Sequence, residues 1–412
     1  MNNKRTKIGV FTCAHLIINI IIILCFITTS SLLGYQIGAT YLEIVIIFIG
    51  GLVTITQLGN KRILNSYLKC IIPIILFTVI EFIYYPINGL LWIRMVLLLC
   101  VSIGICIYAD SRHVNIFKQF YYIVLIYTVL NLVVYSAVAL FHLNLPYQVF
   151  QNDWLHAHNN YFYLLYDHAG LSGQIFGPFM VSRNEGIFTE PGVFAVLLDL
   201  ELLIYYFTDF KKQKWHLIII LVALLSTIST TGLGLAILII GFEALVNNKI
   251  RDRFSKVTIF LIGFTTAFVV IVWLLDQKLT HATASFDWRF YDWISGIELF
   301  IKKPLLGWGY RNHFIFEQLM LNRYGLARGN TNSISSVLYQ LGIMGSMIYI
   351  VPILCVNKML KKQNRIQKRR FFFTVICIVL IVMSEPIIDS ALLILILGYV
   401  YSKQILINQA HL

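Results

Sequence analysis

The sequence predicts an all-α polytopic membrane protein with about twelve transmembrane helices. Of its 412 residues, 58% are hydrophobic and only 12% are charged, which leaves too few charges to cover a soluble protein of this size. The apolar residues gather in runs of about 16 to 22 residues, the length of helix that crosses a hydrocarbon core. Each run is apolar on both faces, so the alternation typical of an outer-membrane barrel is absent.

Polar segments separate the expected helices of a single membrane domain, residues 1–412. The predicted spans are 9–28, 41–58, 70–87, 90–109, 119–141, 188–207, 216–231, 232–247, 257–275, 333–356, 371–386 and 389–405. Two of the connections between them are long, namely 142–187 and 276–332. Both are rich in aromatic residues and histidine, which disfavours disorder, so we expect both loops to fold against the membrane.

The distribution of lysine and arginine predicts the orientation of the chain. With a cytoplasmic N-terminus, most of the 32 positive residues fall in cytoplasmic segments, including the run KKQNRIQKRR at 361–370. Both termini are then cytoplasmic, and both long loops are extracytoplasmic. The net charge of +13 reflects this topology, and no soluble basic face is present that would bind nucleic acid. Because no small-residue cleavage pattern follows MNNKRTK, we expect an uncleaved first helix.

No metal site, disulfide or cofactor is expected. All seven cysteines fall in apolar runs, where they cannot bridge the long loops. His156, His158 and His168 are weak evidence for a metal, because zinc needs three or four convergent ligands, and we expect them to be solvated loop histidines. The chain also contains no nucleotide-binding motif.

Arginines in the two long loops point to an anionic ligand. The positive-inside rule disfavours cations on this side of the membrane, yet five arginines lie there: Arg183, Arg289, Arg311, Arg323 and Arg328. The planar fork of a guanidinium suits the oxygens of a phosphate group. The alternative is that these arginines pair with lipid head groups or with the loop carboxylates Asp287, Asp292 and Glu317.

Three residues in the same loops are candidates for a general base. Glu185 and Glu190 directly precede the sixth span, and carboxylates at a membrane entrance are costly unless they are solvated, paired or functional. Such a carboxylate could take a proton from a sugar hydroxyl, although both glutamates could instead pair with arginines. His313 could act as a base near neutral pH.

Charged residues also fall inside the predicted spans. Arg94 lies toward the outer end of the fourth span, where an intramembrane charge is a functional candidate. Snorkelling of its guanidinium to the interface is an equal alternative. Asp199, Glu201 and Glu243 lie toward the inner ends of their spans, and we expect them to be solvated.

The stretch from Arg289 to Gly309 predicts a helix that lies in the membrane interface. Apolar residues recur there at three- and four-residue spacing, with polar residues largely elsewhere, as in an amphipathic interfacial helix. The apolar residues are Phe286, Phe290, Trp293, Ile297 and Ile301. Pro304 would end the helix, and Gly307 and Gly309 would permit a tight turn. The middle of the helix is expected to be a support and not a site.

Several motifs fall between residues 183 and 345. They are Arg289, Trp293 and the segment from Pro304 to Gly309; Asn332, Gly342 and Gly345; Ser229, Thr231 and Gly232; and Arg183, Gly186, Glu190 and Pro191. Together they resemble the motifs of the O-antigen polymerase and O-antigen ligase superfamily, in particular the Wzy-type polysaccharide polymerases. In that family Asn332 and the two glycines after it would open the span that follows the large loop.

The resemblance implies a glycosyltransferase of the bacterial cytoplasmic membrane that needs neither metal nor nucleotide. Such enzymes take a glycan from undecaprenyl diphosphate at the outer face and pass it to a sugar hydroxyl of another lipid-linked unit. Undecaprenyl-diphosphate-linked oligosaccharides and membrane lipids are then the expected partners, and a chain-length regulator and a flippase are candidates. The residues expected to bind the diphosphate are Arg183 and Arg289, with Arg311, Arg328 and Arg94 in support. The candidates to orient or deprotonate the acceptor hydroxyl are Glu190, Glu185 and His313.

Two departures from the family pattern affect this expectation. Thr331 stands where ligases and many relatives carry histidine, and Thr230 stands where many carry arginine. The first departure removes the most obvious base and favours a polymerase over a ligase. A flippase of lipid-linked oligosaccharides is the alternative from another class, but flippases have repeated halves and short loops, which this chain lacks.

Overall fold

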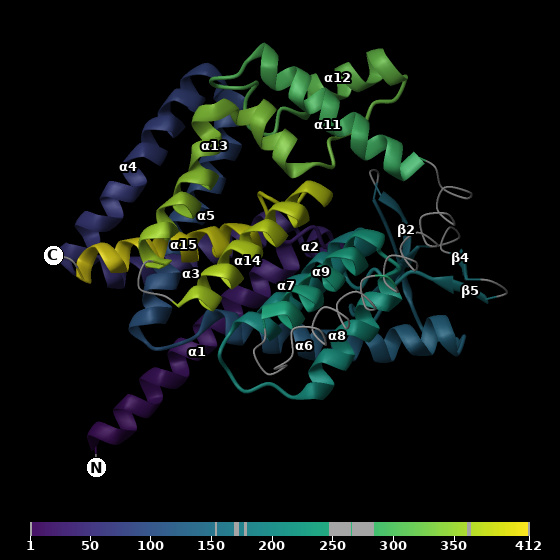
Figure 1. Cartoon of the computed structure of the whole chain (residues 1–412), viewed down its shortest axis with the longest axis horizontal. Coiled ribbons are helices and arrows are strands. Elements are labelled where there is room, and N and C mark those ends of the chain that lie inside the picture. Colours follow the sequence, from purple (N-terminus) through teal and green to yellow (C-terminus); the bar gives the residue numbers. More distant parts are fainter. Residues whose placement is uncertain are drawn as a thin grey trace. The chain divides into compact units, whose positions relative to one another are not determined.

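The computed structural model describes residues 2–152, 155–168, 173–176, 179–246, 265, 284–360 and 364–410, and it is mostly helical (Figure 1). The helices are α1 (Asn2–Thr28), α2 (Leu32–Ile37), α3 (Ala39–Leu58), α4 (Lys61–Tyr84), α5 (Pro86–Ser111), α6 (Ile116–Tyr135), the π-helix η1 (Ser136–Leu140), α7 (Pro191–Phe207), α8 (Lys214–Thr227), α9 (Thr230–Val246), α11 (Ala284–Lys302), α12 (His313–Tyr324), α13 (Ser333–Leu360), α14 (Arg365–Ser384) and α15 (Ala391–Ala410).

Every predicted span except one falls on one of these helices, and the exception, 257–275, lies almost wholly outside the described residues. Five of the described helices are long and apolar enough to cross a membrane: Ala39–Leu58, Lys61–Tyr84, Pro86–Ser111, Ile116–Leu140 and Ser333–Cys355. Shorter apolar helices are Cys13–Thr28, Lys214–Thr227, Thr230–Val246 and Ala391–Ile407. The chain is therefore a polytopic membrane protein.

The prediction of an all-α chain is wrong for the first long loop, which contains two small antiparallel sheets. The first sheet has the order β1 (Gln148–Asn152), β2 (Leu155–Tyr161), β3 (Leu165–His168), and the second pairs β4 (Gly173–Phe176) with β5 (Phe179–Ser182). The turn between β2 and β3 places Phe162 and Tyr163 at φ 57° and 58°. Such turns normally carry asparagine and glycine, so the usual sequence signal of a hairpin is missing here.

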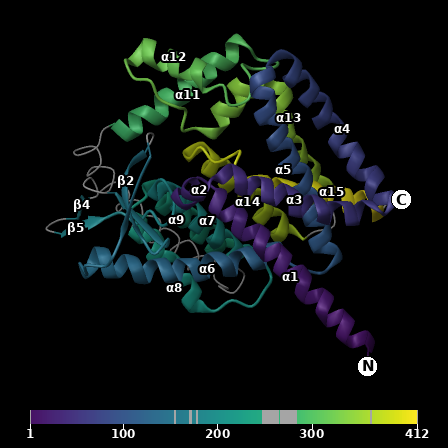
Figure 2. The same ribbon diagram turned by 180° about the vertical axis from the view of Figure 1, so that it is seen from behind.

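The chain divides into two compact units, which are described separately. Unit 1 comprises 1–29, 39–116 and 284–412, and unit 2 comprises 30–38 and 117–283. In unit 1, α5 packs against α3, α4 and α15. The views from the front and from behind both show α4 and α5 side by side (Figure 1, Figure 2).

Unit 2 is built around α7, which packs against α8 and α9. The segment before α7 is joined to the chain around α2 by backbone hydrogen bonds, from Leu32 N to Ile187 O (2.7 Å) and from Thr189 N to Ser30 O (3.1 Å). The Tyr166 hydroxyl of β3 donates to Gln36 Oε1 at 2.7 Å, which ties the first sheet to α2. The first loop is therefore packed into unit 2.

The predicted amphipathic helix is present as α11, but its polar side faces the protein. Asp292 and Ser295 are fully buried, whereas Phe290 and Ile301 are 57% and 68% exposed. Leu299 continues the buried face, in a core with side chains of α12 and α13. The exposed apolar stripe is what a helix beside lipid presents. The buried polar side chains point inward, where they can form contacts within unit 1.

Candidate functional site

The candidate site lies in unit 1, where two chain segments distant in sequence pair through their backbones. Segment 304–309, after α11, and segment 339–344, inside α13, are joined by hydrogen bonds of 2.8–3.2 Å. These bonds run from Trp308 N to Tyr339 O, from Gly309 N to Gln340 O, from Ile343 N to Pro304 O and from Met344 N to Leu305 O. The turn after α11 is thus fixed onto α13.

Two glycines permit this pairing. Gly307 has φ +70°, and a Cβ there would lie 2.3 Å from Gln340 O. Gly342 has φ +61°, and a Cβ there would lie 2.3 Å from Leu305 O. Only glycine fits at such positions. Gly342 has non-helical backbone angles and forms a kink at which two helical segments of α13 meet.

The same turn docks on the junction of α4 and α5. The Tyr85 hydroxyl donates to Gly307 O at 2.7 Å, and Asn88 Nδ2 donates to Tyr310 O at 2.9 Å. Tyr310 N donates to Oε1 of Glu81 at 2.7 Å, and the Glu81 side chain is fully buried. These contacts fix the backbone at Tyr310, and they therefore also fix the position of Arg311, the next residue.

Arg311 is held by a carboxylate from the connection between α14 and α15. Its Nη2 and Nε lie 2.6 and 2.8 Å from Oδ2 of Asp389, and the Tyr310 hydroxyl donates to the same oxygen at 3.2 Å. Burial lowers the pKa of Arg311, but the Asp389 carboxylate outweighs it and raises that pKa above its usual value. Arg311 N donates to Gln340 Oε1 at 2.8 Å, and the residue has φ +56°, a strained conformation that contacts on both sides maintain.

Arg311 and Asp389 border a small polar cavity of about 60 Å³, which His313 also lines. The remaining lining comes mainly from α13, with Ser333, Ser336, Gln340 and Tyr349 among its polar members. Desolvation, and then the neighbouring Arg311 guanidinium, lower the pKa of His313 from 6.5. A neutral imidazole at neutral pH can accept a proton.

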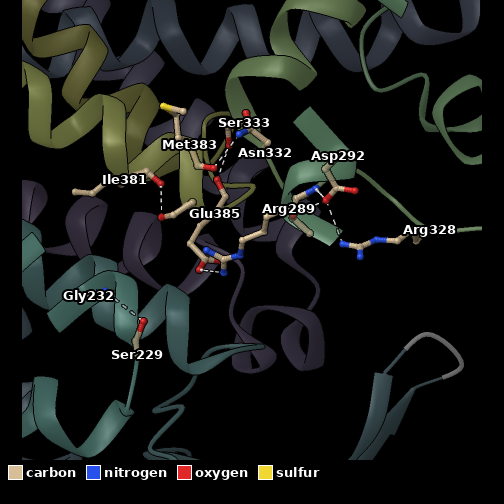
Figure 3. Close-up of polar contacts among 12 residues, drawn as sticks. Ser229, Gly232, Arg289, Asp292, Arg328, Asn332, Ser333, Ile381, Met383 and Glu385 are labelled. Atoms are coloured by element: carbon tan, nitrogen blue, oxygen red, sulfur yellow. Dashed lines mark hydrogen bonds and ion pairs between the residues drawn. The ribbon is translucent and has the colours of Figure 1, made fainter. Parts of the chain in front are cut away.

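Arg289 pairs with a second carboxylate of the same connection. Its Nη2 lies 3.2 Å from Oε1 of Glu385, which is 2% exposed, whereas the Arg289 side chain is 37% exposed (Figure 3). The Ser333 hydroxyl donates to the Glu385 carbonyl at 2.6 Å, and Asn332 Nδ2 donates to Met383 O at 3.0 Å. Hydrogen bonds from Asn332 and Ser333, at the start of α13, thus fix the backbone at Glu385.

Arg328 pairs with Asp292, the fully buried carboxylate of α11 (Figure 3). The distance from Arg328 Nη2 to Asp292 Oδ2 is 3.1 Å, and the guanidinium lies over the Trp288 ring. Thr331 donates to the same oxygen through its amide (3.0 Å) and its hydroxyl (2.5 Å). At the position where relatives carry histidine, this chain therefore has a hydroxyl bound to a buried carboxylate.

The fourth arginine expected from the sequence in this unit has a different environment. Arg94 of α5 lies 3.1 Å from Glu43 of α3, and it also donates to the Thr40 hydroxyl at 3.3 Å. The pair joins two neighbouring helices. Arg94 is thus held by a carboxylate partner within the helix bundle.

The other predicted residues lie in unit 2. Arg183 Nε donates to Thr227 O at 3.1 Å, at the turn between α8 and α9. Glu185 is buried, with Oε2 3.5 Å from Nε2 of His158, which is 1% exposed. The prediction of a solvated histidine is therefore wrong for His158. Glu190 is the exposed residue that precedes the first turn of α7.

The expectation that the carboxylates of α7 are solvated is also wrong. Asp199 and Glu201 are both fully buried. Their carboxylate oxygens have no hydrogen-bond partner within the described part of the chain.

Three carboxylates were missed from the sequence as site residues: Asp292, Glu385 and Asp389. Glu385 and Asp389 lie where the last two apolar runs meet. Acidic residues at the end of a span are a functional signal that could have found both of them. Among the described residues, no cluster of three or more histidine, cysteine and carboxylate side chains could hold a metal ion.

Comparison with known proteins agrees with the motifs. Residues 215–350 match the family model Wzy_C, described as O-antigen ligase, and this range includes α11, the glycine turn and the first half of α13. No curated protein matches the chain. Residues 215–350 of the chain are thus similar to the O-antigen ligase and polymerase family, whose members are glycan-transferring enzymes.

Proposed function

We propose that the protein polymerises undecaprenyl-diphosphate-linked oligosaccharide repeat units at the outer face of the bacterial cytoplasmic membrane. The observation that carries this proposal is that Arg289, Arg311 and Arg328 of unit 1 each pair with a carboxylate, two of them on the connection between α14 and α15. Three oriented guanidiniums in a unit of apolar helices suit a lipid diphosphate, whose prenyl chain requires apolar surroundings. In this proposal both termini are cytoplasmic.

The reaction joins two lipid-linked glycans. The hydroxyl oxygen of the incoming unit forms a bond to the anomeric carbon of the growing chain, and the bond from that carbon to the diphosphate oxygen breaks. The arginines stabilise the charge that develops on the diphosphate. The hydroxyl proton passes to a base, for which His313, Glu185 and Glu190 are the candidates. His313 is supported by its position beside Arg311 and by its lowered pKa.

Thr331 supports a polymerase in preference to a ligase. Its hydroxyl donates to Asp292, where the ligases of the family carry a histidine. A ligase transfers a finished glycan once to a different acceptor, whereas a polymerase uses its own product as the next donor. The sizes of the products therefore distinguish the two activities.

The test is incubation of the purified protein with defined lipid-linked repeat units, followed by sizing of the products on a gel. We expect a ladder of chains from the wild-type protein and only single units from Arg289→Ala, a loss of at least about 100-fold. Arg323→Ala is the matched control, because Arg323 lies in the same loop and pairs with the partly exposed Glu298. A normal ladder from Arg289→Ala at normal protein level would refute the role of Arg289.

Spheroplasts of a deletion strain test the alternative of a flippase. Unpolymerised units at the outer face are expected for a missing polymerase. Accumulation of the units on the inner face would instead identify a flippase and overturn the proposal.

A further inference from the structure

Each arginine of the candidate site already has an anion beside it before any substrate binds. The pairs are Arg289 with Glu385, Arg311 with Asp389 and Arg328 with Asp292. In every pair the carboxylate is less exposed than the arginine; the exposed fractions are 2% and 37% for the first pair, 26% and 31% for the second, and 0% and 25% for the third. A diphosphate that binds these arginines must therefore share them with, or take them from, fixed carboxylates.

Such competition matters most after transfer. While the diphosphate carries the glycan, one of its oxygens is bonded to the sugar. When that bond breaks, the oxygen keeps the electron pair, so the product diphosphate bears more negative charge than the donor did. Arginines alone would then bind the product more tightly than the substrate. A polymerase that adds many units must release this product in each cycle.

Glu385 has the properties of a fixed competitor for Arg289. Its side chain is 2% exposed, and its backbone is held by Ser333 and by the Asn332 contact to Met383. Arg289 is the more exposed member of the pair and is attached to a different element, α11. If the Arg289 guanidinium moved toward a ligand, the Glu385 carboxylate would therefore stay in place. It could then pair with Arg289 again.

We propose that Glu385 is a positioning residue that competes with the diphosphate for Arg289 and thereby releases the spent lipid diphosphate after each transfer. The inference depends on the proposed function. Asp389 has the same relation to Arg311, which it contacts through two guanidinium nitrogens. The opposite expectation holds for a purely structural carboxylate, whose loss would misplace Arg289 and weaken the binding of anions.

The test compares the affinity of the purified full chain for farnesyl diphosphate, a short prenyl diphosphate, with its turnover on lipid-linked units. In Glu385→Gln the competing charge is removed, so the Kd for farnesyl diphosphate should fall about tenfold. Both KM and kcat should fall, because the product leaves more slowly. Glu298→Gln, which removes the charge of an exposed carboxylate on the same helix, should change none of these values.

The outcomes separate this inference from the proposed function. Equal binding of farnesyl diphosphate by the wild type and Arg289→Ala would refute the diphosphate site itself. Weaker binding by Arg289→Ala, with unchanged or weaker binding by Glu385→Gln, would overturn only the competing role of Glu385. If Glu385→Gln does not accumulate, Asp389→Asn is measured instead, and a Kd that does not fall would overturn the proposal.

Discussion

Two carboxylates of the same helix show how different an arginine pair can be. Asp292 and Glu298 lie on α11, and each is within 3.1 Å of an arginine nitrogen. The Asp292 side chain is fully buried, whereas that of Glu298 is 29% exposed and is shared between Arg323 and Lys302. In the sequence both are acidic residues among aromatic ones. Only their burial in the structure distinguishes the Asp292 pair of the candidate site from the surface ion pair of Glu298.

Burial also determines how much stability is lost when one partner of an ion pair is removed. A surface pair contributes little, because water and salt screen it. In a buried pair, the loss of one partner is costly, since the remaining charge stays away from water. The same geometry therefore predicts different consequences at the two positions, and mutations can test the difference.

The largest expected difference is in stability. Arg328→Ala removes the arginine partner of a fully buried carboxylate, so the free energy of unfolding should fall by about 3 kcal/mol. Arg323→Ala, in the same loop, should leave it unchanged within error. Chemical denaturation in detergent measures both values. Equal losses in the two variants would show that burial of Asp292 does not decide the energetics.

A second difference concerns two glycines with left-handed backbone in the same loop. Gly307 and Gly325 have φ +70° and +72°, but only Gly307 faces backbone atoms closer than 3 Å, and nothing lies within 4 Å of the position of a Cβ on Gly325. Alanine should cost about 1 kcal/mol at Gly325 from backbone strain alone. At Gly307 the cost should be about 1 to 3 kcal/mol larger, because the segments must separate.

Denaturation of the two alanine variants checks this prediction, and the ladder assay adds a second measurement. Separation of the two segments would displace Arg311, so Gly307→Ala should also shorten the products. Gly325→Ala should keep the wild-type ladder. Comparable stability and comparable products in both variants would contradict the role assigned to the backbone pairing.

The helices were predictable from the sequence because their signal is local. A run of about 20 apolar residues has few alternatives to a membrane helix, so every predicted span that falls on described residues is helical. The hairpin of β2 and β3 was missed because Phe162 and Tyr163 occupy turn positions that usually carry asparagine and glycine. The kink at Gly342 was not predicted, because its cause, the approach of Leu305, is nearly 40 positions away in sequence.

The arginines of the site were also predictable, since cations on the disfavoured side of a membrane stand out. Among their partners, Asp292 was named as a possible ion-pair partner, whereas Glu385 and Asp389 were not. Glu385 and Asp389 reach the site only through the packing of α13 against α14 and α15, and no local pattern gives that packing. Asp292 was assigned to the polar face of an interfacial helix, and the structure shows that this face is turned inward.

The smallest expected effect concerns pH and the identity of the base. We hypothesise that His313 accepts the proton, because it lines the cavity beside Arg311. Only the neutral imidazole can do so, and burial together with Arg311 lowers its pKa, whereas Asp389 and Glu317 act in the opposite direction. The rate should therefore decline only below pH 6.5. In Glu317→Gln, one raising influence is gone, so the decline should move to lower pH.

Rate profiles of the wild type, Glu317→Gln and His313→Gln provide the measurement. His313→Gln should be slow at every pH and should lack the acidic decline. A fast His313→Gln variant with the wild-type profile would exclude the histidine and leave Glu185 and Glu190 as the candidates.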